Sequence, residues 1–238
     1  MKIIIYKLIV ALICISTNFL YSQNPVSEKK GTRTIYLIRH GDYSQTDEQD
    51  EFVGNELTPL GIAQARLLAA RLKAMSFEFN SITSSTMTRA RQTAIVISED
   101  FPGLNLEQDS LICECTPPSW RKDVMAGVDT TEKGKCVEII ETAFAKYFIP
   151  SPDEKDRQDL IVCHGNVIRY FVAKVLNVDT MSWLQMSITN CSLTIIRINS
   201  DGSMKLDAFS DYGHIPENMR TFTGGDNETK ELIIPELK

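Results

Sequence analysis

The stretch TIYLIRHGDYS, residues 34–44, begins with five residues typical of a buried strand and then changes abruptly to RHG at residues 39–41. A second apolar run, LIVC at 160–163, is followed in the same way by HG at 164–165. Glycine at such a place lets the backbone approach another group closely. Because both strands end in His-Gly, the joint pattern indicates a site more strongly than either stretch alone.

Strands and helices alternate along the chain from residue 33 onward, which predicts an α/β fold. We expect a three-layer sandwich with a mostly parallel central sheet and helices on both faces. Helices are expected near 59–75, 87–98, 135–148 and 167–176, and further strands near 79–83, 104–106, 111–113, 192–198 and 204–209. The segment from Cys115 to Lys135 is rich in Thr, Pro, Gly and charge and predicts a loop.

The composition is that of a globular protein with a full core. The 238 residues are 43% hydrophobic and 24% charged, and the formal net charge is −6. This acidic balance argues against a nucleic-acid-binding surface, so a site for anions must concentrate positive charge locally. We expect one domain over 33–216, preceded by a linker over 23–32 and followed by a polar tail over 217–238.

The N-terminus has the pattern of a targeting segment, because Lys2 and Lys7 precede an apolar run and a polar exit follows. A signal peptide over residues 1–22, cleaved near Ser22, is the expected interpretation. It implies a secreted or periplasmic protein with no membrane span after processing. The alternative is an uncleaved N-terminal anchor that keeps the protein on a membrane. It is the less favoured interpretation, because a span needs about 20 apolar residues and the run here is barely long enough.

Five cysteines remain after such a cleavage, at positions 113, 115, 136, 163 and 191. There is no Cys-x-x-Cys pair and there are only three histidines, so no metal site and no cofactor is expected. In an oxidising compartment one or two disulfides are possible, but the odd number leaves at least one thiol. The expectation is buried, mostly free thiols.

Several cationic side chains are expected at one edge of the sheet, since ligands of open α/β sheets bind at the carboxyl ends of the strands. Arg39 and His40 end one strand and His164 ends another, while Arg89 lies in the first turn of a helix launched from a third. These groups repel one another unless an anion lies between them. A phosphate dianion removes that repulsion and matches the geometry of guanidinium groups.

Each of these residues also has an ordinary structural interpretation. Arg39 alone would be a surface charge, and His40 alone is as readily a hydrogen-bonded structural histidine. Arg91 faces away from Arg89 along the helix and is expected to be solvated, and His214 is interpreted as a surface or structural histidine. The functional interpretation therefore depends on the set, not on any one member.

The motifs together resemble the histidine phosphatase superfamily, in its phosphoglycerate-mutase-like branch. The matching stretches are LIRHG at 37–41, LTPLG at 57–61, SSTMTRARQTA at 84–94 and CHGNVIRY at 163–170. The last of these, and the DYG at 211–213 after the hairpin, are especially similar to the mitochondrial serine/threonine protein phosphatase of the family. The resemblance spans residues 34–216, and Tyr43 departs from it, since many members carry a small hydroxyl residue there.

The resemblance implies a role for each matched residue. His40 would be the nucleophile that becomes phosphorylated, and Arg39, Arg89 and a protonated His164 would hold the phosphoryl oxygens. Glu114 occupies the place of the family's general acid. Its competitors in the sequence are Glu107, Asp109 and Asp123, and the residues expected at the substrate are Gly41, Gly165 and Asn166.

The function that follows from the resemblance is a metal-independent phosphomonoesterase with a phosphohistidine intermediate. Its substrate would be a phosphorylated small molecule or a phosphoprotein. A phosphoglycerate-type mutase and a catalytically silent phosphate-binding module are the alternatives. The segment 115–135 is short for a lid, which favours access of water and therefore hydrolysis.

Overall fold

A computed structural model describes residues 30–44 and 53–222 of the chain. The expected signal peptide over 1–22, most of the linker and the tail beyond 222 lie outside these ranges, so the structure does not bear on them. Within the described ranges, none of the helices is long and apolar enough to cross a membrane.

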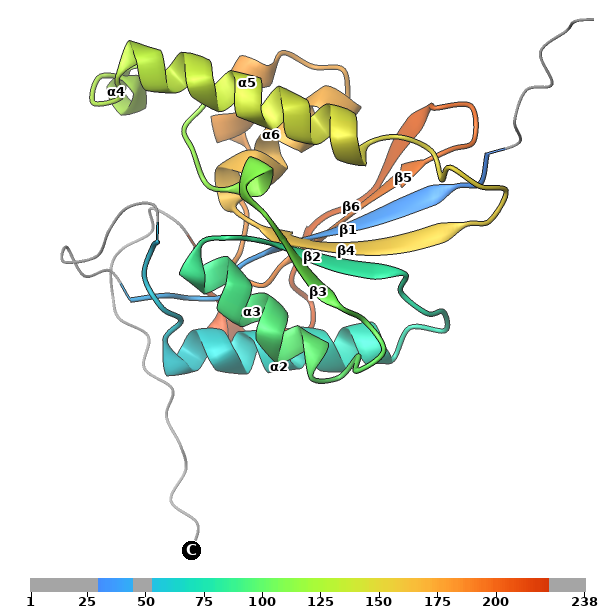
Figure 1. The fold of residues 1–238 in the computed structure, drawn as a ribbon. Helices are drawn as coiled ribbons and strands as arrows, with labels where there is room; N and C mark the ends of the chain where they lie inside the picture. The colour runs from blue at the N-terminus through green and yellow to red at the C-terminus, as the bar shows by residue number, and fades with distance from the viewer. Residues whose placement is uncertain (1–29, 45–52, 223–238) are drawn as a thin grey trace, which may run out of the picture.

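The centre of the fold is a six-stranded sheet in the order β3-β2-β4-β1-β5-β6 (Figure 1). The first four strands in this order run parallel, whereas β5 runs antiparallel to β1 and β6 antiparallel to β5. This confirms the predicted α/β fold with a mostly parallel sheet. The strands are β1 (Arg33–Arg39), β2 (Ser81–Ser85), β3 (Leu106–Asp109), β4 (Arg157–Cys163), β5 (Leu193–Ile198) and β6 (Met204–Asp211).

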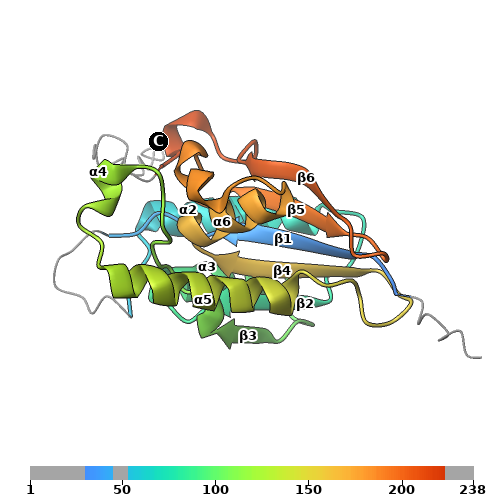
Figure 2. The ribbon, with the colours of Figure 1, turned by 90° about the horizontal axis from the view of Figure 1, so that it is seen from above.

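Helices cover both faces of the sheet, as Figures 1 and 2 show. Helices α2 and α3 lie against one face, and α5 and α6 lie against the other. The helices are α2 (Pro59–Lys73), α3 (Thr88–Ser98), α4 (Lys122–Met125), α5 (Thr130–Tyr147) and α6 (Gly165–Val175), with 3₁₀ turns η1 (Ser110–Ile112), η2 (Thr180–Gln185) and η3 (Glu217–Met219). The cap predicted for the first helix is present, since Thr58 precedes α2 and its Oγ1 accepts the N–H of Gly61 in the first turn of the helix.

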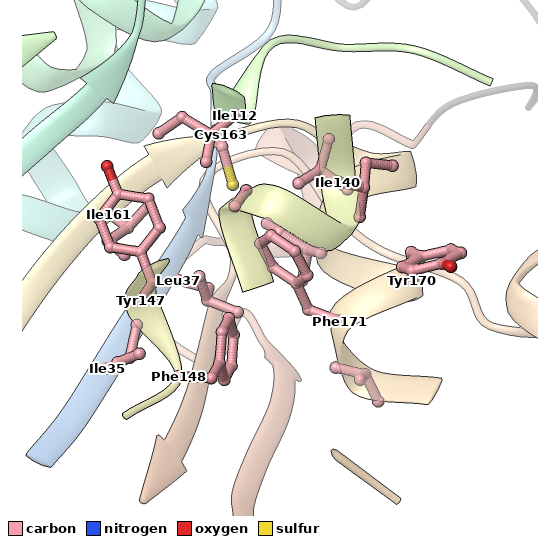
Figure 3. Packing of buried hydrophobic residues seen from close by; sticks show 14 of the residues in the cluster. Ile35, Leu37, Ile112, Ile140, Tyr147, Phe148, Ile161, Cys163, Tyr170 and Phe171 are labelled. Carbon is pink, nitrogen blue, oxygen red and sulfur yellow. The ribbon is translucent and has the colours of Figure 1, made fainter. Parts of the chain in front are cut away.

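Alternation along β1 divides the core into two layers. Ile35 and Leu37 face α5 and α6, where Figure 3 shows them beside Phe148 and Phe171, while Tyr36 and Ile38 face α2 and α3. Both central strands, β1 and β4, are covered on both sides. This explains why each contains a continuous apolar run, residues 35–38 in β1 and 160–163 in β4, that ends at the site.

Two expectations for the middle of the chain are wrong. A single strand, β3, replaces the two predicted near 104–106 and 111–113, and the second of these regions forms the turn η1. The predicted loop 115–135 contains α4 and the start of α5, which begins at Thr130. Asp129 caps α5 by accepting the N–H groups of Thr131 and Glu132, so the helix begins before its apolar periodicity does.

Three of the five cysteines are free, as expected, and one of the possible disulfides is present. Cys115 and Cys136 form a disulfide across a sequence separation of 21, joining the segment after η1 to α5. Cys113, Cys163 and Cys191 are free, and the last two are buried. The sequence could not show the pairing, because the two cysteines become neighbours only through the packing of α5.

Replacing both bridged residues, Cys115→Ser with Cys136→Ser, is expected to lower the free energy of unfolding by about 3 kcal/mol, because the disulfide restricts the unfolded chain. Urea unfolding followed by circular dichroism measures the change. A reductant should have the same effect on the unmodified protein and none on the double variant. Equal unfolding curves for oxidised wild type and double variant would show that the bridge does not stabilise the fold.

Candidate active site

The parallel pairing of β1 with β4 brings two of the predicted residues together. Arg39 is the last residue of β1 and is paired with Cys163, the last residue of β4. His40 and His164 therefore follow on adjacent strands, and their ring centroids are 5.1 Å apart. Arg89, the second residue of α3, reaches the same place and donates its Nε–H to His40 Nε2 at 3.1 Å. The expected gathering of cationic groups at one edge of the sheet is present.

His40 is held as a neutral ring with one nitrogen available. Its Nδ1 lies 2.8 Å from the carbonyl oxygen of Gly41, which can only accept, so Nδ1 carries the proton. Nε2 is the unprotonated nitrogen that accepts from Arg89. Burial lowers the pKa of His40 well below its usual value, and the charges of His164, Arg39 and Arg89 act in the same direction.

The backbone around His40 is fixed by a residue that the sequence did not indicate. Asn190, in the loop before β5, is buried and donates Nδ2–H to the His40 carbonyl at 3.0 Å. Its Oδ1 accepts from the Thr221 hydroxyl. A lone asparagine between two predicted elements carries no pattern in the sequence, so only the fold could reveal it.

Arg39 points inward although it ends a strand. Its guanidinium is buried and donates to the carbonyl oxygen of Ile188 at 2.7 Å. Burial lowers the pKa of Arg39 to about 10, and the nearby Glu114 carboxylate opposes that shift. The group therefore remains charged at neutral pH, and the interpretation as an ordinary surface charge is excluded.

His164 lies in surroundings that affect the charge of its ring. The ring is fully buried, and burial, with the charges of Arg89 and Arg39, lowers its pKa well below the usual value. The two guanidinium groups nearby therefore disfavour a protonated His164 in the ligand-free site, and its protonation beside a phosphoryl group stays a prediction. His164 Nε2 is 2.8 Å from Ser85 Oγ.

Glu114 is the acidic residue that the structure places at the site. Its Oε1 accepts the Asn166 N–H at 3.2 Å, at the start of α6. Burial raises the pKa of Glu114, while Arg89, Arg39 and Arg169 oppose the rise. A raised pKa keeps the carboxyl protonated closer to neutral pH, which is the property that a proton donor needs.

The three competing acids lie elsewhere. Asp109 accepts hydrogen bonds from Lys146 and Tyr147 on α5. Asp123 is exposed and paired with Arg121, and Glu107 is an exposed residue of β3. None of these contacts involves His40 or His164.

The residues predicted to contact substrate have structural partners of their own. A Cβ at Gly41 would lie 2.7 Å from the carbonyl oxygen of Gly61, and one at Gly165 would lie 3.2 Å from Ile188 Cγ2. The Asn166 side chain bridges Cys115 O and Arg169. Close packing thus accounts for both glycines, and their contact with substrate stays a prediction.

Two further residues complete the surroundings of Arg89. The Tyr43 ring lies 4.9 Å below the Arg89 guanidinium and meets the His40 ring edge-on at a centroid distance of 5.1 Å. Gly54 has a positive φ of 73°, and a Cβ there would lie 2.6 Å from Arg89 Nη1. Tyr43, which departs from the pattern of the family, therefore packs against both Arg89 and His40.

The arrangement can bind an oxyanion and exchange protons with it. Among residues 30–44 and 53–222, no group of three or more His, Cys, Asp or Glu side chains could hold a metal ion. Two guanidinium groups, two neutral imidazoles and a carboxyl with a raised pKa surround one place. These are the components of phosphoryl transfer to a histidine.

Comparison with known proteins agrees with this chemistry. The model of the histidine phosphatase superfamily (branch 1) matches residues 35–138 and 143–211. The chain belongs to this superfamily, and it is a phosphatase.

The curated relatives point to one group within the family. The chain is 40% identical to the mitochondrial serine/threonine-protein phosphatase Pgam5 of Caenorhabditis elegans, over 83% of the chain and 70% of that protein. It is 33% identical to the human mitochondrial protein PGAM5, over 81% of the chain and 67% of that protein.

Solved structures share the fold. Phosphoglycerate mutase from Plasmodium falciparum superposes with a TM-score of 0.56 at 28% identity, covering 79% of this chain and 96% of the mutase. A mycobacterial glucosyl-3-phosphoglycerate phosphatase superposes with a TM-score of 0.55 at 20% identity, covering 76% and 99%.

The prediction of a secreted or periplasmic protein is wrong. The curated relatives that the chain matches are named mitochondrial proteins. A lysine followed by an apolar run does not by itself specify the compartment to which a segment is directed, so the interpretation of residues 1–22 went beyond the pattern.

Proposed function

We propose that this phosphatase hydrolyses phosphate monoesters through a phosphohistidine at His40. The observation that carries the proposal is the hydrogen bonding of this ring, with Nδ1–H on the Gly41 carbonyl and Nε2 unprotonated beside Arg89. A neutral imidazole whose unprotonated nitrogen lies beside a guanidinium group is poised to attack the phosphorus of a phosphoryl group bound there.

The reaction has two steps. In the first, the Nε2 lone pair forms the P–N bond as the P–O bond to the leaving group breaks, and Glu114 gives its proton to the departing oxygen. Arg39 and Arg89 stabilise the charge that develops on the phosphoryl oxygens. In the second, water attacks phosphorus and passes its proton to the Glu114 carboxylate, and Nε2 recovers its lone pair as phosphate leaves.

We further propose that the substrate is a phosphoprotein bearing phosphoserine or phosphothreonine. The names of the relatives at 32–40% identity, all serine/threonine-protein phosphatases, support this substrate class. They also favour hydrolysis over the mutase reaction, since the mutase among the solved structures shares only 28% identity. The assignment of a domain over 33–216 is part of the same proposal.

The test uses p-nitrophenyl phosphate and a phosphothreonine peptide with excess EDTA. Release of inorganic phosphate from both, undiminished by the chelator, is the expected result. Exchange between phosphoglycerate isomers without release of phosphate would instead support the mutase. Turnover that stops with EDTA and returns with a divalent metal would contradict the proposed mechanism.

Glu114→Gln tests whether Glu114 is the proton donor, because a donor affects how kcat/KM depends on pH and on the leaving group. Protonated Glu114 is lost as pH rises through its raised pKa, so kcat/KM should fall on the alkaline side. The variant should lose that limb of the profile. Its kcat/KM should also fall about 10²- to 10³-fold with an alkyl phosphate. The fall should be much smaller with p-nitrophenyl phosphate, whose leaving group needs little protonation. Equal losses with both substrates would exclude Glu114 as the donor.

A further inference from the structure

His164 holds one ring nitrogen against a side chain and leaves the other without a partner. Nε2 is 2.8 Å from Ser85 Oγ, whereas buried Nδ1 has no hydrogen-bond partner within the described part of the chain. The two nitrogens of an imidazole point in diverging directions, so Nδ1 is turned away from Ser85. A buried nitrogen beside Arg39 and Arg89 is a group that a bound oxyanion would satisfy.

The surroundings of Ser85 decide where its single hydroxyl proton lies. Ser85 Oγ accepts the Met87 N–H at 3.2 Å, and the Sγ of Cys113 lies 3.3 Å away. The proton can therefore go either to this sulfur or to His164 Nε2. Thiol sulfur is a weak acceptor and an imidazole nitrogen a much stronger one, so the proton belongs on the hydrogen bond to His164.

We propose that Ser85 is a positioning residue whose hydroxyl donates to His164 Nε2 and so keeps the imidazole proton on Nδ1, facing the phosphoryl group. The neutral His164 then donates a hydrogen bond to a phosphoryl oxygen without becoming charged. The identity of that ligand rests on the proposed function, but the position of the proton does not.

The charges around His164 agree with a neutral donor. Arg39 comes from the end of β1 and Arg89 from α3, and both disfavour a third full positive charge in the ligand-free site. His40 faces the ring from the adjacent strand end and is itself neutral, and the Glu114 carboxyl accepts the Asn166 N–H at the start of α6. A donor that needs no protonation remains competent at every pH at which His40 is neutral.

The position of the proton can be measured directly, because the chain has only three histidines. The full chain is labelled with ¹⁵N-histidine and studied by NMR near pH 7.5, free and with vanadate, and His164→Asn identifies the His164 signals. In the wild type we expect a protonated Nδ1 and an unprotonated Nε2 for His164. A protonated Nε2, or a doubly protonated ring, in both states would overturn the proposal.

Variants connect the tautomer to activity. Ser85→Ala should give a mixture of His164 tautomers, weaken vanadate binding and lower kcat/KM about tenfold, the effect of weakening one hydrogen bond to a charged group. Ser85→Thr keeps the hydroxyl and should restore both properties. Ser84→Ala is the matched control, since the neighbouring Ser84 is equally buried and its hydroxyl has no hydrogen-bond partner among the described residues.

The outcomes separate this proposal from the proposed function. If Ser85→Ala keeps the wild-type tautomer and kinetics, Ser85 does not position the proton and the proposal fails. If the wild type shows the expected tautomer but hydrolyses no phosphate ester, the positioning role stands and the proposed function fails. Equal losses for Ser84→Ala and Ser85→Ala would show a general packing effect and overturn the specific role.

Discussion

His40→Ala is expected to abolish turnover, with a loss of at least about 10⁴-fold in kcat, because the variant lacks the atom that forms the bond to phosphorus. The structure gives this ring one unprotonated nitrogen, at Nε2, and places it beside Arg89. Steady-state hydrolysis of p-nitrophenyl phosphate measures the loss. No other residue in the proposed mechanism supplies a nucleophile, so the remaining activity should be near background.

Binding separates loss of chemistry from loss of structure in this variant. Arg39 and Arg89 remain in place when the imidazole is removed, so His40→Ala should still bind vanadate or phosphate, as measured by calorimetry. His164→Asn, which keeps a donor near Nδ1, should retain more activity than His40→Ala. Substantial turnover by His40→Ala would refute the assignment of the nucleophile.

The second large effect is expected for Arg89→Ala, which should lower kcat/KM by about 10²- to 10³-fold while the fold persists. The guanidinium is buried, donates to His40 Nε2 and lies 4.9 Å from the Tyr43 ring. Its removal takes away both a phosphoryl-binding charge and the group that orients the nucleophile. Kinetics on p-nitrophenyl phosphate, together with circular dichroism, measures activity and folding in parallel.

Arg91 offers a matched control two residues further along the same helix. Its side chain is exposed, as the sequence predicted for the solvated face of this helix. Arg91→Ala should therefore change neither activity nor stability beyond about 0.5 kcal/mol. If both variants lose activity equally, the effect comes from the net charge of α3 and the specific role of Arg89 is wrong.

The sheet could be predicted because its central strands have an unambiguous pattern. Strands β1 and β4 are buried on both faces, so each contains a continuous apolar run, and His-Gly follows the end of each strand. Strand β3 was misplaced because it lies at the edge of the sheet and has exposed Glu107 and Gln108 at its centre. Edge strands carry little hydrophobic signal, so their boundaries follow from pairing with β2.

The inner residues of the site were predictable for a related reason. Arg39, His40, His164 and Arg89 stand at fixed offsets from strand ends and a helix start, where a parallel sheet gathers ligands. Asn190 reaches the site from a loop without regular structure, and its contact exists only in the assembled fold. The neutral state of His164 also depends on burial, which no residue pattern records.

The pairing of the cysteines and the compartment of the protein are two properties that residue types alone do not determine. Five cysteines at irregular spacing admit many pairings, and only the packing of α5 brings Cys136 to Cys115. The apolar N-terminal run suggested secretion, whereas the matched relatives are named mitochondrial proteins. In both cases the decisive information lies outside the local sequence.

The most direct measurement for this mechanism is rapid quenching of the enzyme with ³²P-labelled p-nitrophenyl phosphate, followed by peptide mapping under alkaline conditions, in which phosphohistidine survives. We expect one acid-labile label, on the peptide that contains His40, absent from His40→Ala and accumulating in Glu114→Gln. A protein that turns over substrate without ever carrying label, or that carries it on a serine, threonine or cysteine, would contradict the account.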